Sequence, residues 1–164
     1  MKIVLVHPDK LPKTYYQVIG EITYKWSLIE YLIHDISRYY LGLGKKEGRV
    51  AFYKSGAREK ISVLKTTAHG WVNDENISEE IKAIAKETEK LNKERNNIVH
   101  GVWGHKHNEP RGKYYLLYVT EFKERIFPKA KMTDAESLQN IAVKINKLLA
   151  RIRKLYADAG IPEP

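Results

Sequence analysis

The sequence of 164 residues predicts an all-α fold, an antiparallel bundle of four main helices with a short extended or β insertion between the third and the fourth. Apolar residues recur every three or four positions in four segments, which is the period of an amphipathic helix. Glycines and capping residues fall at the ends of these segments. Only KIVLV at 2–6 and KYYLLYVT at 113–120 have the composition of strands. We expect a single domain over residues 1–164.

The first helix is predicted from about Lys13 to Leu41. Its apolar stripe alternates steps of four and three residues, which is typical of a long helix packed lengthwise against others. Gly42 and Gly44 then end the helix. The residues GKKEGR at 44–49 are predicted as a charged loop. The stripe consists of Tyr15, Ile19, Ile22, Trp26, Ile29, Ile33, Ile36 and Tyr40.

The second and third helices are predicted over residues 53–71 and from Asn76 or Ser78 to about Val102. A Ser-Gly pair at 55–56 can delay the start of the second helix. The second stripe consists of Tyr53, Ala57, Ile61, Leu64, Ala68 and Trp71. The third stripe consists of Ile77, Ile81, Ile84, Thr88, Leu91, Arg95, Ile98 and Val102.

The fourth helix is predicted to begin at Thr133 and to continue to Gly160. Thr133 and Glu136, three residues later, have the spacing of a capping box. The insertion between the third and fourth helices covers residues 104–131. Its first part, GHKHNEPRGK, is predicted as a loop that leads into the strand at 113–120. The fourth stripe consists of Leu138, Ile141, Ile145, Leu148, Ile152 and Leu155.

The composition limits the classes of function. Apolar residues make up 43% of the chain and charged residues 30%, which is typical of neither a disordered tail nor a membrane protein. No stretch has transmembrane length and MKIVLVHP is too short for a signal peptide, so we expect a cytoplasmic protein. The absence of cysteine excludes a disulfide scaffold, a thiolate zinc site and a cysteine nucleophile. The net charge of +9 favours a polyanionic partner such as RNA.

One residue breaks the third stripe, because Arg95 stands where the spacing calls for an apolar side chain. A buried guanidinium without a partner is costly. One interpretation is a structural ion pair, for which Glu30 on the first helix is the best-placed carboxylate. The other is a functional site, because Asn96 and Asn97 follow the arginine directly and His100 lies five residues after it.

At Arg95-Asn96 and His100 the sequence resembles the HEPN superfamily of helical-bundle domains, whose signature is Arg, four to six residues and then His, often with a polar residue after the Arg. The resemblance implies a metal-independent endoribonuclease that needs no cofactor. Arg95 would hold and neutralise the scissile phosphate, and His100 would act as general acid or base. Asn96 is a further candidate for orienting the phosphate, and Glu30 for orienting Arg95.

The chemistry suits these residue types. RNA carries its own nucleophile, the 2′-OH, so the protein needs only to position the strand, transfer protons and stabilise charge. Histidine, with an ordinary pKa near 6.5, transfers protons at neutral pH, and arginine stays charged and matches two phosphate oxygens. We expect a 2′,3′-cyclic phosphate and a 5′-OH as products.

Residues five apart on an ideal helix are separated by roughly 7.5 Å of rise and about 140° of turn, so their side chains diverge. Arg95 and His100 therefore meet at one phosphate only if the helix ends or distorts near residues 98–101, or if two chains combine their motifs. The resemblance implies the second solution, a homodimer, and suggests a toxin or defence component with a protein antitoxin. Val102 stands where some HEPN toxins carry a modified tyrosine, which gives no support for neutralisation by that route.

Other interpretations remain open. The chain could be a non-catalytic HEPN-like module that binds RNA, nucleotide or a protein partner, or a basic helical protein unrelated to HEPN. His105 and His107 near His100 suggest either a metal site or, as we favour, surface histidines. Basic residues on the fourth helix form either a track for an RNA backbone or a solvated face, and we favour the solvated face. They are Lys144, Lys147, Arg151 and Lys154.

Overall fold

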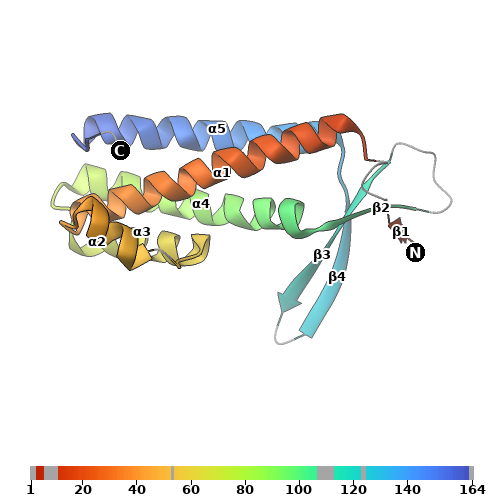
Figure 1. The fold of residues 1–164 in the computed structure, drawn as a ribbon, viewed down its shortest axis with the longest axis horizontal. Coiled ribbons are helices and arrows are strands. Elements are labelled where there is room, and N and C mark those ends of the chain that lie inside the picture. Colours follow the sequence, from red (N-terminus) through yellow and green to blue (C-terminus); the bar gives the residue numbers. More distant parts are fainter. Residues whose placement is uncertain (1–2, 6–10, 53, 107–112, 123–124, 163–164) are drawn as a thin grey trace. The chain divides into compact units, whose positions relative to one another are not determined.

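A computed structural model describes residues 3–5, 11–52, 54–106, 113–122 and 125–162. Five helices and four strands are formed by these residues, so the prediction of a mainly helical chain is confirmed (Figure 1). In chain order they are β1 (Ile3–Leu5), α1 (Lys13–Tyr40), α2 (Lys45–Phe52), α3 (Ala57–Gly70), α4 (Glu75–His100), β2 (Val102–Lys106), β3 (Tyr115–Phe122), β4 (Arg125–Met132) and α5 (Ala135–Asp158).

The chain divides into two compact units. The first, the sheet unit, consists of Met1–Thr23 and Lys93–Val143. The second, the helical unit, consists of Tyr24–Asn92 and Lys144–Pro164. Helices α1, α4 and α5 each contribute residues to both units, whereas α2 and α3 belong to the helical unit alone.

Side-chain bonds link four helices of the helical unit into a closed ring. Lys60 on α3 bonds to Glu30 on α1, and Lys65 on α3 bonds to α4. Arg151 on α5 bonds to α4, and Tyr156 on α5 bonds to α1. Figure 1 shows α4 running opposite to α1 and α5, which run in the same direction as each other. The bundle is therefore antiparallel only in part, because α1 and α5 run in the same direction.

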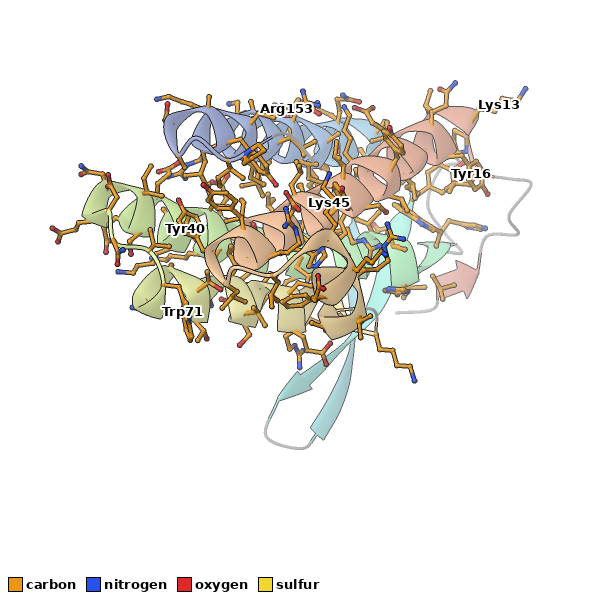
Figure 2. All side chains as sticks on the ribbon, turned by 60° about the vertical axis from the view of Figure 1, so that its left-hand side comes forward. Lys13, Tyr16, Tyr40, Lys45, Trp71 and Arg153 are labelled. Atoms are coloured by element: carbon orange, nitrogen blue, oxygen red, sulfur yellow. The ribbon has the colours of Figure 1, made fainter. Side chains whose placement is uncertain are left out.

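The core of the helical unit is formed mostly by the stripes that the sequence predicts, since burial follows the helical period. The residues with no exposed surface include Trp26, Ile29, Ile33, Ile36, Leu64, Ile81, Ile84, Ile145, Leu148 and Ile152. The second stripe is wrong at its end, because Trp71 follows α3 and is 51% exposed (Figure 2). Tyr53 lies outside the described residues.

Helix α2 is the main correction to the predicted helices, because residues 44–49 were expected to be a loop and the bundle to have four main helices. The segment is highly charged, and its local sequence favours a turn. Phe52 and Gly48 are nevertheless buried, and the Gly48 carbonyl oxygen lies 3.2 Å from Nε2 of His34 on α1. Tertiary contacts with α1 therefore stabilise a helix that the local sequence disfavours.

Glycines follow the ends of α1 and α5, and aspartates cap the starts of α4 and α5. Gly42 and Gly160 have φ of 67° and 60°, the left-handed region that glycine adopts readily at a helix C-terminus. At the N-termini, Asp74 and Asp134 accept hydrogen bonds from the backbone N–H groups three residues later. The predicted start of the third helix at 76 or 78 is therefore one or more residues late. The predicted Thr133 capping box does not form, because Asp134 caps α5.

The sheet unit contains an antiparallel sheet in the order β1-β2-β3-β4. Both strands predicted from composition are confirmed as β1 and β3. Strand β2 replaces the beginning of the predicted loop at 104–113 and also ends the third helix before Val102. Strand β4 was not predicted at all. It contains Pro128, which argues against a central strand, and it lies at the edge of the sheet, where proline is tolerated.

Candidate functional site

Arg95 lies in α4 with its guanidinium partly withdrawn from water. Its stripe neighbours Leu91 and Ile98 are 2% and 3% exposed, whereas Arg95 itself is half-buried. Nη1 of Arg95 donates a 2.9 Å hydrogen bond to Oδ1 of Asn96. Nε is buried and has no hydrogen-bond partner among the described residues. The structure thus brings two of the predicted site residues together and leaves one arginine donor unused.

His100 is the last residue of α4 and its side chain is exposed. The next residue, Gly101, donates its N–H to the Asn97 carbonyl oxygen at 2.9 Å, and the chain enters β2 at Val102 (Figure 1). A Cβ on Gly101 would lie 2.6 Å from a Leu116 methyl group. The position is therefore restricted to glycine, and the tight junction between α4 and β2 determines where His100 stands.

The helix is regular from Arg95 to His100, because α4 ends only after the histidine. Their side chains consequently diverge by about 140° around the helix axis. Neither an earlier helix end nor a break brings the two side chains of one chain to a single phosphate. Asn97 is half-buried on the same turn, and no site role for it follows from its contacts.

Glu30 lies in the helical unit, whereas Arg95 lies in the sheet unit. Oε2 of Glu30 accepts a 3.1 Å hydrogen bond from Nζ of Lys60 in a half-buried ion pair. The structure therefore gives the Glu30 carboxylate a lysine partner that the sequence analysis did not consider. The pairing of Glu30 with Arg95 stays a prediction.

The histidines beyond the helix form no metal centre that the structure describes. His105 is exposed on β2, and His107 lies outside the described residues. No cluster of three His, Asp or Glu side chains with the geometry for a metal ion occurs among the residues with described positions.

Arg151, which the sequence places in a basic row on the last helix, is part of an ion-pair network between α5 and α4. Its Nε and Nη2 donate to the two carboxylate oxygens of Glu80 at 2.5 and 2.8 Å, and Nη1 donates to Glu87 at 3.1 Å. The bond to Arg151 lowers the pKa of Glu80. Lys147 and Lys154 are exposed in the same row. The row is thus interrupted by a cation whose charge is already matched.

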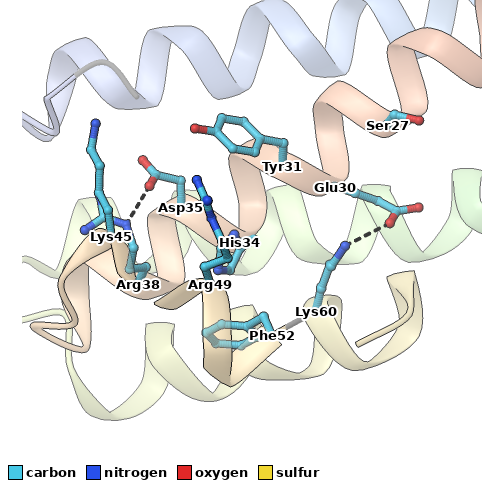
Figure 3. A pocket seen from close by; sticks show the side chains of 10 residues that line it. All are labelled: Ser27, Glu30, Tyr31, His34, Asp35, Arg38, Lys45, Arg49, Phe52 and Lys60. Carbon is cyan, nitrogen blue, oxygen red and sulfur yellow. Dashed lines mark hydrogen bonds and ion pairs between the residues drawn. The ribbon is translucent and has the colours of Figure 1, made fainter. Parts of the chain in front are cut away.

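A pocket of about 390 Å³ in the helical unit was not predicted. It lies among α1, α2 and the beginning of α3, and charged side chains dominate its wall (Figure 3). The signal in the sequence was the stretch 45–65, which holds seven basic residues against two acidic ones. The lining residues are Ser27, Glu30, Tyr31, His34, Asp35, Arg38, Lys45, Arg49, Phe52 and Lys60.

A buried acidic residue, Asp35, organises one side of this pocket. Its Oδ1 accepts a 2.7 Å hydrogen bond from Nε of Arg38, and its Oδ2 lies 3.2 Å from the Tyr156 hydroxyl, which donates. Burial and the neighbouring Asp35 charge raise the pKa of Tyr156 far above its usual range. Arg38 also donates through Nη1 to the Leu43 carbonyl oxygen at 2.8 Å. The arginine is therefore held in one orientation from two sides.

His34 of α1 lines the pocket next to α2. Its ring packs edge-on against Phe52, with centroids 4.7 Å apart. Burial, followed by the charges of Lys60 and Arg38, lowers the pKa of His34, although the Gly48 carbonyl oxygen acts in the opposite direction. At neutral pH the ring is therefore uncharged, and its Nε2–H donates to Gly48.

Comparison with known proteins finds no match: no family model fits the chain, and no curated protein or solved structure is significantly similar to it. Within the described part of the chain, none of the helices combines the length and apolar character needed to cross a bilayer.

Proposed function

We propose that this chain is a HEPN-like, metal-independent endoribonuclease that cleaves RNA through attack by the 2′-OH. The observation that carries the proposal is the state of Arg95. Its Nη1 is oriented by Asn96, its Nε is buried without a partner in the described structure, and it stands five residues before an exposed histidine. A preoriented guanidinium on a half-buried side chain is suited to binding a phosphate oxygen through its outer nitrogens.

In this reaction Arg95 would contact the non-bridging oxygens of the scissile phosphate and neutralise the charge that develops there. His100 would take the proton from the 2′-OH, or give a proton to the departing 5′ oxygen. The bond from the 2′ oxygen to phosphorus forms as the bond to the 5′ oxygen breaks, which yields a 2′,3′-cyclic phosphate and a 5′-OH. Exposure of His100 supports this role, because solvent can return the histidine to its starting protonation state.

The active form would be a homodimer, because one regular helix directs Arg95 and His100 away from each other. Two copies related by a two-fold axis would place the arginine of one chain beside the histidine of the other. If the protein is a toxin or defence component, a protein antitoxin would be a further partner. Expression of the wild type would then arrest growth, whereas expression of His100→Ala would not.

The test is cleavage of end-labelled RNA in EDTA by the wild type, Arg95→Lys, His100→Ala and the control His69→Ala, which removes an exposed histidine from α3. We expect a loss of about 10²- to 10⁴-fold for His100→Ala, the usual contribution of a general acid or base. Arg95→Lys keeps the charge but removes the planar fork, and should also lower the rate. Equal activity in all four preparations would indicate a contaminating nuclease and remove the proposal.

Binding measurements on these proteins distinguish the nuclease from the second candidate function, a module that binds RNA without cutting it. RNA that is bound by the wild type and never cut would identify the chain as a non-catalytic HEPN-like binding module. Mixing Arg95→Ala and His100→Ala chains tests the composite site, because a mixed dimer regains one intact Arg–His pair. Recovery of activity on mixing supports a shared site, and absence of recovery contradicts it.

A further inference from the structure

We propose that the pocket among α1, α2 and α3 binds a small phosphate monoester of sugar-phosphate type, with Lys45 and Arg49 holding the phosphate. The volume of about 390 Å³ lies in the range of small-molecule sites, which is about 300–1,000 Å³. All of its lining residues belong to the helical unit, so the pocket does not depend on Arg95 or His100.

The pairing of charges in the pocket favours an anion. Four cationic side chains face two carboxylates across the lining. The two carboxylates are already engaged, Glu30 by Lys60 at 3.1 Å and Asp35 by Arg38 at 2.7 Å. The remaining cations, Lys45 and Arg49, have no carboxylate partner in the described parts of the chain. An incoming phosphate would supply the missing negative charge.

Lys45 and Arg49 stand four residues apart on α2, which places both on the same face of that short helix. Like charges at this spacing destabilise a helix, so the pair is unfavourable until an anion bridges it. Figure 3 shows both side chains with Arg38 at one end of the pocket. Arg38 uses Nε and Nη1 in bonds to the protein, so its Nη2 is the group that can reach a ligand.

The opposite end of the pocket carries groups that suit a hydroxylated organic moiety. Figure 3 shows Ser27 and the Glu30–Lys60 pair at this end, and the ring of Tyr31 between this end and the end that holds Lys45 and Arg38. Glu30 uses Oε2 for Lys60, and its other carboxylate oxygen can accept from a sugar hydroxyl. The exposed ring of Tyr31 offers an apolar surface against which a sugar can pack.

The wall formed by α2 is held in place before any ligand binds. Gly48 lacks a Cβ where one would lie 2.6 Å from Cγ and Cδ of Arg38, so helix and arginine approach closely. The stem of Arg38 cannot yield easily, because its guanidinium is tied to Asp35 and to the Leu43 carbonyl oxygen. Preorganisation of this kind reduces the entropic cost of binding.

The experiment is titration calorimetry of the full chain with ribose 5-phosphate, AMP and inorganic phosphate. We expect saturable binding of at least one of the two esters, tighter than that of inorganic phosphate. The ester that binds more tightly identifies the organic group, and either one supports the proposal. Binding of inorganic phosphate alone, or as tightly as both esters, would reduce the pocket to a site for simple anions and overturn it.

Variants assign the binding to the pocket. We expect Lys45→Gln/Arg49→Gln to weaken ester binding at least tenfold. The matched control Lys46→Gln/Arg58→Gln removes the same charge from exposed positions of α2 and α3 outside the pocket, and should bind as the wild type does. An equal loss in both double variants would indicate general charge attraction and contradict the proposal.

The outcome is independent of the proposed nuclease function. His100→Ala should keep its ester binding even where it loses RNA cleavage. If Lys45→Gln/Arg49→Gln instead loses RNA binding while no ester binds to the wild type, the pocket is part of an RNA surface, and the small-molecule proposal is wrong.

Discussion

Replacement of Gly101 by alanine tests how the junction between α4 and β2 is built. A Cβ at this position would lie 2.4 Å from the Asn97 carbonyl oxygen, 2.6 Å from Leu116 Cδ1 and 2.9 Å from the Leu117 carbonyl oxygen. Two of these three atoms belong to the backbone of a helix end and of a strand, so the contacts cannot be relieved by a side-chain rotation. The helix end or the strand has to shift.

The expected cost follows from this geometry. Overpacking of a well-packed site costs typically about 1–3 kcal/mol, and the rigid neighbours place Gly101→Ala toward the upper part of that range. A chain of this size loses roughly 2–4 °C of Tm for each kcal/mol. The control is Gly20→Ala in α1, where a Cβ meets nothing within 4 Å. Alanine in a helix is favoured over glycine by about 0.5–1 kcal/mol, so the control should stabilise the protein.

The assay is urea unfolding of the wild type and both variants, followed by circular dichroism, with Tm measured in parallel. Opposite signs for the two glycine replacements confirm the reasoning. A Gly101→Ala protein as stable as the wild type would refute it, because the junction would then have room for a side chain. Since His100 precedes the junction, Gly101→Ala should also lower RNA cleavage if the proposed function holds, whereas Gly20→Ala should not.

Three further predictions concern the helical unit. The half-buried His34 has a lowered pKa, so near its ordinary pKa of about 6.5 the unfolded chain binds more protons than the folded one, and stability falls as the pH drops through that value. In His34→Gln, urea midpoints between pH 7 and 5 should therefore fall less. Tyr156→Phe leaves Oδ2 of the buried Asp35 without its donor and should cost about 1–3 kcal/mol in urea unfolding, with an unchanged m-value. Arg151→Lys loses the bidentate geometry, but the Arg151 side chain is 37% exposed, so the loss of unfolding free energy should be only about 0.5–1 kcal/mol. This loss should shrink in 1 M NaCl, and a loss that does not change with salt would contradict the reasoning.

Long helices were predictable because each carries its own evidence. The stripes of α1 and α5 repeat over many turns, and most of their positions are buried in the structure, whereas Ile19, Tyr40 and Ile141 are half-buried. The break in the α4 stripe at Arg95 was equally predictable, because the spacing of the apolar residues alone shows that an apolar side chain is expected at position 95. Exact helix starts were less accurate, because several capping residues stand near each start and the competition between Thr133 and Asp134 is decided by the local backbone path.

The pocket could not be predicted, because its lining residues come from three helices. Whether a lining cation is available to a ligand depends on which carboxylates pair with it in the folded chain. Lys60 and Arg38 look like ordinary surface cations in the sequence, and only the structure assigns them to Glu30 and Asp35. Lys45 and Arg49 acquire significance because no carboxylate remains for them in the described pocket wall. Which charges stay unmatched is a property of the packed chain.

The sequence by itself determined the helical class of this protein, its principal core residues and the position of Arg95 before His100, because periodicity and spacing are properties of a single segment. Only the tertiary structure decided that residues 45–52 form a helix, that the chain after His100 enters a sheet, and that four strands pair in order. Each of these depends on burial against distant residues, such as Phe52 against His34 and Gly101 against Leu116, and no local pattern encodes such contacts.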